Sequence, residues 1–93
     1  MTARVVRSAR AELEVLAIVE HLAEYSLPAA ERFLAALERA RQQLAQFPNS
    51  GPTGTRPGTR RLVVGDYIVS YRRRGEDVEI FAVRHARRRD ARF

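Results

Sequence analysis

The second half of the chain alternates between short apolar runs and glycine-containing turns. Runs rich in β-branched and aromatic residues occupy positions 61–64, 67–71 and 78–83, and Gly65-Asp66 and Gly75-Glu76-Asp77 separate them. Residues of this kind favour extended backbone, and tight turns with glycine join antiparallel strands. The pattern therefore predicts three strands that form an antiparallel meander.

The first half of the chain has the periodicity of helices instead. Apolar residues recur every three or four positions in two stripes: Ala11, Val15, Ile18, Leu22 and Tyr25, and then Ala30, Phe33, Leu37, Ala40, Leu44 and Phe47. Such spacings place side chains on one face of a helix, with the charged residues on its flanks. Two amphipathic helices are predicted, each with one face that packs in a core.

Polar residues and prolines mark the ends of the predicted helices. Ser8 is a good N-cap for the first helix because its side-chain oxygen can accept a bond from a first-turn N–H. Pro28 suits the first turn of the second helix, which Ser26 or Leu27 would cap. Pro48 ends the second helix. The link between the helices is short, so they are expected to form an antiparallel αα-hairpin.

The predicted order of elements is β-α-α-β-β-β, which is an α+β fold. Residues 3–6 form a short first strand, and residues 48–58, six of which are Gly or Pro, form the loop that leads to the meander. The helix hairpin is expected to pack on one face of an antiparallel sheet. The first strand must join the meander at an edge or between its members, because a lone strand leaves its backbone unpaired. The other face of the sheet is expected to be open.

Length and composition agree with one small domain spanning residues 1–93. A chain of 93 residues has no room for a second core, and we expect its tail, residues 86–93, to be flexible in the free protein. The absence of cysteine excludes disulfides and cysteine-based metal sites. The N-terminus lacks the apolar segment of a signal peptide, and no apolar run approaches the roughly 20 residues that span a bilayer. A cytoplasmic protein with no membrane partner is expected.

The excess of positive charge is confined to the second half of the chain. The net charge is +6; residues 1–47 carry six Arg and six Glu, and residues 48–93 carry eleven Arg and five acidic residues. The excess therefore lies entirely in the half that contains the predicted sheet. Such segregation favours a polyanionic partner, either a nucleic acid or an acidic peptide.

Three groups of residues resemble one protein family. They are Arg60 and Arg61 at the start of a strand, the hairpin Gly65-x-Tyr67-x-x-x-Tyr71-Arg72, and Val83-x-His85 followed by arginines, within PGTRRLVVGDYIVSYR and VEIFAVRHARR. Together with the helical opening and the Pro/Gly loop, they resemble toxins of the ParE/RelE superfamily of type II toxin–antitoxin systems. The resemblance extends from about residue 5 to residue 89, and the fold that it implies agrees with the predicted order of elements.

The resemblance implies an antitoxin partner, encoded by an adjacent gene, and one of two targets. ParE-type members act on DNA gyrase bound to DNA and have no established catalytic residues. RelE-type members cleave mRNA in the ribosomal A site without a metal, through basic side chains and often a tyrosine or histidine. We expect a ParE-type toxin with no cofactor and no metal. An mRNA endonuclease is the alternative, and a degenerate toxin that only binds its antitoxin is a third reading.

Candidate catalytic residues exist only for the RNase alternative. They are His85, whose ordinary pKa suits a general acid or base, and Arg61, which the resemblance places where RNase members carry a basic catalytic residue. Ile68 occupies the position of a phosphate-contacting arginine in RelE-type enzymes, and the tail offers Phe93 where a tyrosine is expected. The sequence therefore lacks two side chains that the resemblance leads us to expect in an RNase, the phosphate-contacting arginine and the tyrosine of the tail.

Two further sets of residues are expected to bind partners. The target or nucleic acid would contact Arg60, Arg61, Arg72, Arg84, His85, Arg87, Arg88 and Arg89. The antitoxin would contact Leu22, Tyr25, Phe33, Leu37, Arg60 and Arg61, with apolar anchors along the helices and acids at the arginines. Tyr67 and Tyr71 share one face of their strand, so they either pack in the core or stack on a base.

Overall fold

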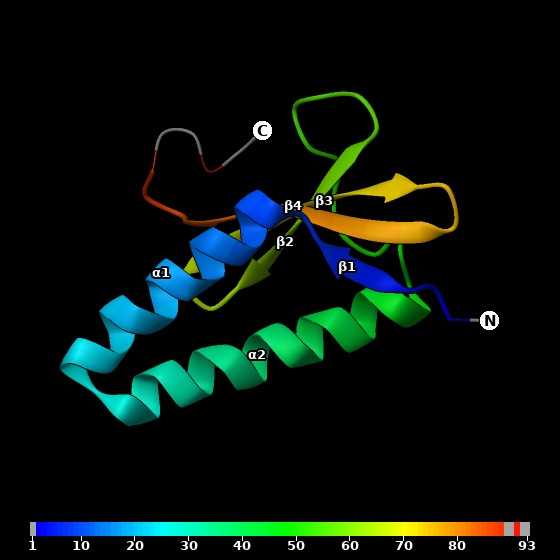
Figure 1. The fold of residues 1–93 in the computed structure, drawn as a ribbon. Coiled ribbons are helices and arrows are strands. Elements are labelled where there is room, and N and C mark those ends of the chain that lie inside the picture. Colours follow the sequence, from blue (N-terminus) through cyan, green and yellow to red (C-terminus); the bar gives the residue numbers. More distant parts are fainter. Residues whose placement is uncertain (1, 89–90, 92–93) are drawn as a thin grey trace.

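The computed structural model describes residues 2–88 and 91. The elements follow in the order β1 (Val5–Arg7), α1 (Ala9–Tyr25), α2 (Leu27–Gln46), β2 (Thr59–Val64), β3 (Tyr67–Arg74) and β4 (Asp77–His85). Figure 1 shows the two helices as one layer and the strands as a second layer. The predicted α+β fold and its order of elements are confirmed.

Two serines define the ends of the helices. The Ser8 hydroxyl accepts a hydrogen bond from the Ala11 N–H at the start of α1. Ser26 ends α1 by donating its N–H to the Leu22 carbonyl, and its hydroxyl accepts from the Ala29 N–H at the start of α2. One extended residue thus serves both helices, which makes the hairpin link as short as the sequence predicts.

The sheet is mixed, with the strand order β1-β4-β3-β2. β2, β3 and β4 form the predicted antiparallel meander, and β1 lies at an edge. β1 pairs with β4 in parallel, from Val5 opposite Val78 to Arg7 opposite Ile80, so the prediction of an antiparallel sheet is wrong for this strand. The local pattern of a three-residue strand carries no information on its direction, which the long helical connection sets.

A bulge in β4 decides which of its side chains face the helices. Ser70 pairs with Ala82 and Tyr71 pairs with Ile80, so Phe81 is an extra residue in β4. Because side chains alternate along a strand, one extra residue reverses the alternation beyond it. Val78 and Ile80 face the helices before the bulge, and Val83 does so after it.

The core lies between the helix hairpin and one face of the sheet. Its buried members are Ala11, Val15, Phe33, Leu37, Ala40, Leu44, Val64, Val69, Tyr71, Val78, Ile80 and Val83, and Tyr67 packs against them. The core role of Tyr71 is therefore confirmed. Two members of the predicted stripes lie outside the core. Tyr25 is 79% exposed at the last residue of α1, and Phe47 is 61% exposed because it is the non-helical C-cap of α2.

The second face of the sheet, which faces away from the helices, is not open as predicted. Ile68, Ser70, Ala82 and Arg84 lie outside the core cluster and are each at most 2% exposed. After β4 the chain turns back: the Ala86 N–H donates to the Asp66 carbonyl, and residues 86–88 lie on the side of the sheet away from α2 (Figure 1). Ala91 is buried as well. The predicted flexibility of residues 86–93 stays a prediction.

Candidate functional site

Arg60 and Arg61 lie on opposite faces of β2. Arg60 pairs with Tyr71, which faces the helices, and Arg61 pairs with Ser70 on the second face. Both guanidinium groups hold the Pro/Gly loop: Arg60 Nη1 donates to the Gly51 carbonyl at 2.8 Å, and Arg61 Nη1 donates to the Thr53 carbonyl at 3.0 Å. The prediction that only one of them can line the second face is confirmed, and that one is Arg61.

Arg84, predicted to contact the target, lies inside the protein. Its side chain is 2% exposed, and its Nε donates to Glu14 Oε2 at 2.9 Å. The other oxygen of Glu14 accepts the Val83 N–H at 3.0 Å. β1 ends opposite Ile80, so beyond this point the Glu14 carboxylate from α1 takes the place of a neighbouring strand. Arg84 thus contributes to a buried ion pair, and the sequence pattern gave no sign of it.

His85 lies at the end of β4 on the face that packs against the helices. It pairs with Tyr67, and the two rings meet edge to face with centroids 5.4 Å apart. The Tyr67 ring in turn packs edge to face on Phe33 of α2. His85 Nδ1 accepts the Arg87 N–H at 3.1 Å. Burial, and then the nearby charge of Asp66, raise the pKa of Tyr67 above its usual value.

The two candidate catalytic residues do not converge. His85 shares the helix-facing side with Tyr67, whereas Arg61 shares the second face with Ser70. Next to His85 lies a hollow of about 320 Å³ whose lining includes Ile18 and His21 of α1. No group of three or more His, Asp or Glu residues that could hold a metal ion occurs in the described part of the chain.

The arginines at the β3–β4 hairpin surround the largest hollow among those described, with a volume of about 670 Å³. Arg72 Nη2 lies 3.0 Å from Glu79 Oε1, and Arg74 Nη1 lies 3.5 Å from the same oxygen. The Arg72 guanidinium also lies over the Phe81 ring, 5.3 Å from its centroid. Arg72 is exposed, as its predicted binding role requires. Its contacts with Glu79 and Phe81 fix the position of its guanidinium group.

The basic tail is described only in part. Arg87 and Arg88 are exposed, and the Arg88 N–H donates to the His85 carbonyl in a turn. Arg89, also predicted to bind the target, and Phe93 lie outside the described residues. The predicted roles of these tail residues stay predictions.

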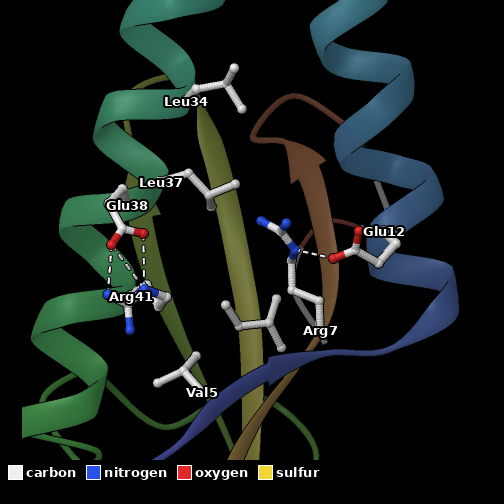
Figure 2. A pocket seen from close by; sticks show the side chains of 8 residues that line it. Val5, Arg7, Glu12, Leu34, Leu37, Glu38 and Arg41 are labelled. Atoms are coloured by element: carbon white, nitrogen blue, oxygen red, sulfur yellow. Dashed lines mark hydrogen bonds and ion pairs between the residues drawn. The ribbon is translucent and has the colours of Figure 1, made fainter.

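A groove of about 360 Å³ runs between α1, α2 and the edge strand β1. Val5, Leu37 and Ile80 contribute its apolar surface, with Leu34 above them, and Figure 2 shows Leu34 and Leu37 reaching across from α2. Two ion pairs form the rims, Arg7 with Glu12 and Glu38 with Arg41. The Arg41 guanidinium holds the pKa of Glu38 below its usual value.

The predicted antitoxin contacts are divided between grooves and core. Leu37 lines the groove of Figure 2 but is 3% exposed, and Phe33, 6% exposed, lines a neighbouring hollow of about 370 Å³ together with Leu22. Sequence reasoning missed Leu34, which is 45% exposed beside the groove. The sequence did contain a signal for Leu34, because it is an apolar residue directly after Phe33 of the buried stripe.

Comparison with known proteins shows one family. The model of the ParE toxin of the type II toxin–antitoxin system parDE matches residues 5–90. Toxin RelE2 of Caulobacter vibrioides is 33% identical over 86 residues, which cover 92% of this chain and 98% of that protein. A putative toxin, Y4kP of Sinorhizobium fredii, is 45% identical over 60 residues, which cover 62% of each chain.

A solved structure has the same fold. It is described as the chromosomal ParDE TA system from P. aeruginosa, and it superposes with a TM-score of 0.76 over 90% of this chain and 96% of the other, at 19% identity. No helix in the described part of the chain is long and apolar enough to cross a membrane.

Proposed function

Because this chain belongs to the ParE toxin family of type II toxin–antitoxin systems, we propose that it inhibits DNA gyrase. It would bind the gyrase–DNA complex in the cytoplasm, block replication, and be neutralised by an antitoxin encoded beside it. ParE-type action requires a shaped, basic surface and no assembled set of proton carriers. The RelE-type alternative requires such a set, so the two readings make different demands on the same residues.

One observation carries this proposal: His85 and Arg61, the two candidate catalytic residues of the RNase reading, lie on opposite faces of the sheet. Cleavage needs a proton acceptor near the 2′-hydroxyl, a donor near the leaving oxygen, and cations on one phosphate. His85 faces the helices, whereas Arg61 is on the second face. On that second face Ile68 is buried, and Arg84 is buried in its pair with Glu14. This separation supports action by binding.

Antitoxin binding is proposed for the groove between α1, α2 and β1. The apolar residues Val5, Leu34 and Leu37 would receive the apolar side chains of an amphipathic segment, and its polar groups would meet the two rim ion pairs. A partner that prefers the native state must stabilise it. We expect the melting temperature to rise with saturating antitoxin, and Leu34→Ala to weaken binding. Leu13→Ala, on the exposed outer side of α1, is the matched control. An unchanged melting temperature would refute binding between this chain and the antitoxin.

The target is tested by two assays run side by side on the purified chain. We expect inhibition of gyrase supercoiling with trapping of cleaved DNA, and intact mRNA on translating ribosomes. Arg87→Ala should weaken gyrase inhibition more than His85→Ala does. Changing Arg87 is preferable to truncating the chain after Arg84, because truncation also removes the buried Ala91.

Ribosome-dependent mRNA cleavage is the second candidate, because a relative of full length bears the RelE name. Codon-positioned cuts that vanish in His85→Ala, with supercoiling unaffected, would establish this enzyme reading instead. If the chain is active in neither assay but still binds its antitoxin, the remaining reading is a degenerate toxin that only binds its antitoxin.

A further inference from the structure

The basic hollow at the β3–β4 hairpin collects cations from separate parts of the chain. Its lining contains five arginines, Arg10, Arg56, Arg72, Arg73 and Arg74, and one acid, Glu79. Arg10 comes from the first turn of α1, Arg56 from the Pro/Gly loop, and the other three from β3. Long-range folding therefore concentrates positive charge here that the sequence distributes over more than sixty positions.

The internal ion pairs do not neutralise this charge. Arg72 and Arg74 share one oxygen of Glu79, so a single carboxylate faces two guanidinium groups. Arg73 Nη2 donates only weakly, at 3.4 Å, to the Glu76 carbonyl, which carries no net charge. Arg10 is exposed and forms no ion pair in the part of the chain that the structure describes. The hollow keeps an excess of positive charge that is accessible to a ligand.

The N-terminus of α1 adds to this positive potential. Ser8 and Arg10 both line the hollow, and Ser8 is the N-cap of this 17-residue helix. The aligned peptide dipoles of a helix give its N-terminus about half a positive elementary charge, and anions bind there. This contribution is independent of the arginine side chains and has the same sign.

From these contacts we infer that the hollow binds the phosphate backbone of duplex DNA. Guanidinium groups and helix N-termini are the usual partners of DNA phosphates and bind them without reading sequence. An acidic peptide fits less well, because it would need apolar pockets and the lining offers only Pro57, which is exposed, and Phe81, whose ring Arg72 covers. The choice of DNA over RNA rests on the proposed function, in which the toxin meets DNA held by gyrase.

The test is the binding of the purified chain to a fluorescently labelled DNA duplex, measured by anisotropy over a range of salt concentrations without gyrase. Each lost arginine–phosphate contact should lower affinity for all sequences and reduce the salt slope by about 1. Arg10→Ala with Arg73→Ala should therefore reduce the slope by about 2. The matched control is Arg32→Ala with Arg39→Ala, which removes the same charge from exposed positions on α2 and should leave the slope unchanged.

A gain of binding is expected from Glu79→Gln. This change removes the acid that faces Arg72 and Arg74 and keeps the shape of the side chain. Affinity for the duplex should rise, and melting curves of each variant show whether it is folded. The inference would be overturned by equal losses in the Arg10→Ala, Arg73→Ala variant and the control variant, by weaker binding of Glu79→Gln, or by a preference for duplex RNA or an acidic peptide.

The outcome is separable from that of the gyrase proposal. Suppose that the chain binds DNA through Arg10 and Arg73 but leaves supercoiling unchanged. This result would support DNA binding at the hollow and refute gyrase inhibition. Suppose instead that the chain inhibits gyrase but does not bind DNA alone, and that its Arg10→Ala, Arg73→Ala variant inhibits equally well. This result would refute DNA binding at the hollow and support the gyrase proposal.

Discussion

The phenol oxygen of Tyr71 accepts the backbone N–H of Gly51 at 2.9 Å, in a buried bond between residues twenty positions apart. Arg60 holds the carbonyl of the same glycine. A Cβ at position 51 would lie 2.2 Å from the Arg61 carbonyl oxygen and 2.8 Å from the Tyr71 hydroxyl, so no larger residue fits without movement of the backbone. The Pro/Gly loop is thereby fixed against the sheet at one point.

Tyr71→Phe should lower the free energy of unfolding by about 1–3 kcal/mol, because the Gly51 N–H would stay buried without an acceptor. The ring itself and its packing are retained. Chemical denaturation of the two proteins measures the difference. Tyr25→Phe is the matched control, because this tyrosine is largely exposed and its change should have no measurable effect. Equal stability of wild type and Tyr71→Phe would show that water reaches this loop.

Glu14→Ala should destabilise the protein by roughly 3–5 kcal/mol, because it leaves the buried Arg84 charge without this carboxylate and exposes the edge of β4. Glu20→Ala, on the exposed side of the same helix, controls for the loss of a helix glutamate. The double change Glu14→Ala, Arg84→Met should be less destabilised than Glu14→Ala alone, since no charge is then left buried. A double variant that is no more stable than Glu14→Ala would contradict this account.

Phe33→Ala should cost roughly 3–5 kcal/mol, which is a large part of the stability of a small domain. Phe33 is in the core and packs edge to face on Tyr67. Its neighbour Leu34 is 45% exposed, so Leu34→Ala should have little effect on thermal melting. The two variants separate core packing from groove binding, because only Leu34→Ala is expected to weaken antitoxin binding in a folded protein. Unchanged melting of Phe33→Ala would place this side chain in solvent.

Tyr67 should contribute a loss of stability at alkaline pH. Its pKa is raised in the folded protein, so above the ordinary tyrosine value of about 10 the unfolded chain loses this proton first. The unfolded state then binds fewer protons than the native state, and stability falls as pH rises. The stability difference between wild type and Tyr67→Phe should be constant from pH 7 to about pH 9 and then shift in favour of Tyr67→Phe. A difference that stays constant up to about pH 11 would contradict the raised pKa.

Local patterns were enough to predict the helices, their caps and the meander. Stripes of apolar residues at three and four positions, the serines before each helix, and glycines at Gly65 and Gly75, which both have positive φ, depend on contacts between neighbours in sequence. The stripes extended one residue too far at Tyr25 and Phe47, because periodicity does not show where a helix stops covering the sheet. The resemblance to the toxin family likewise depended on short motifs.

Only the tertiary structure decided what those motifs do. The parallel pairing of β1, the bulge at Phe81 and the bond from Arg84 to Glu14, seventy positions away, join segments whose relative placement no local pattern encodes. One inserted residue reverses the faces of a strand, so the separation of His85 from Arg61 and the burial of Arg84 follow from register and not from residue type. The sequence by itself determined that the chain is basic and which elements it forms. The packing of α1 and the loop against the β3–β4 hairpin determined where that charge gathers.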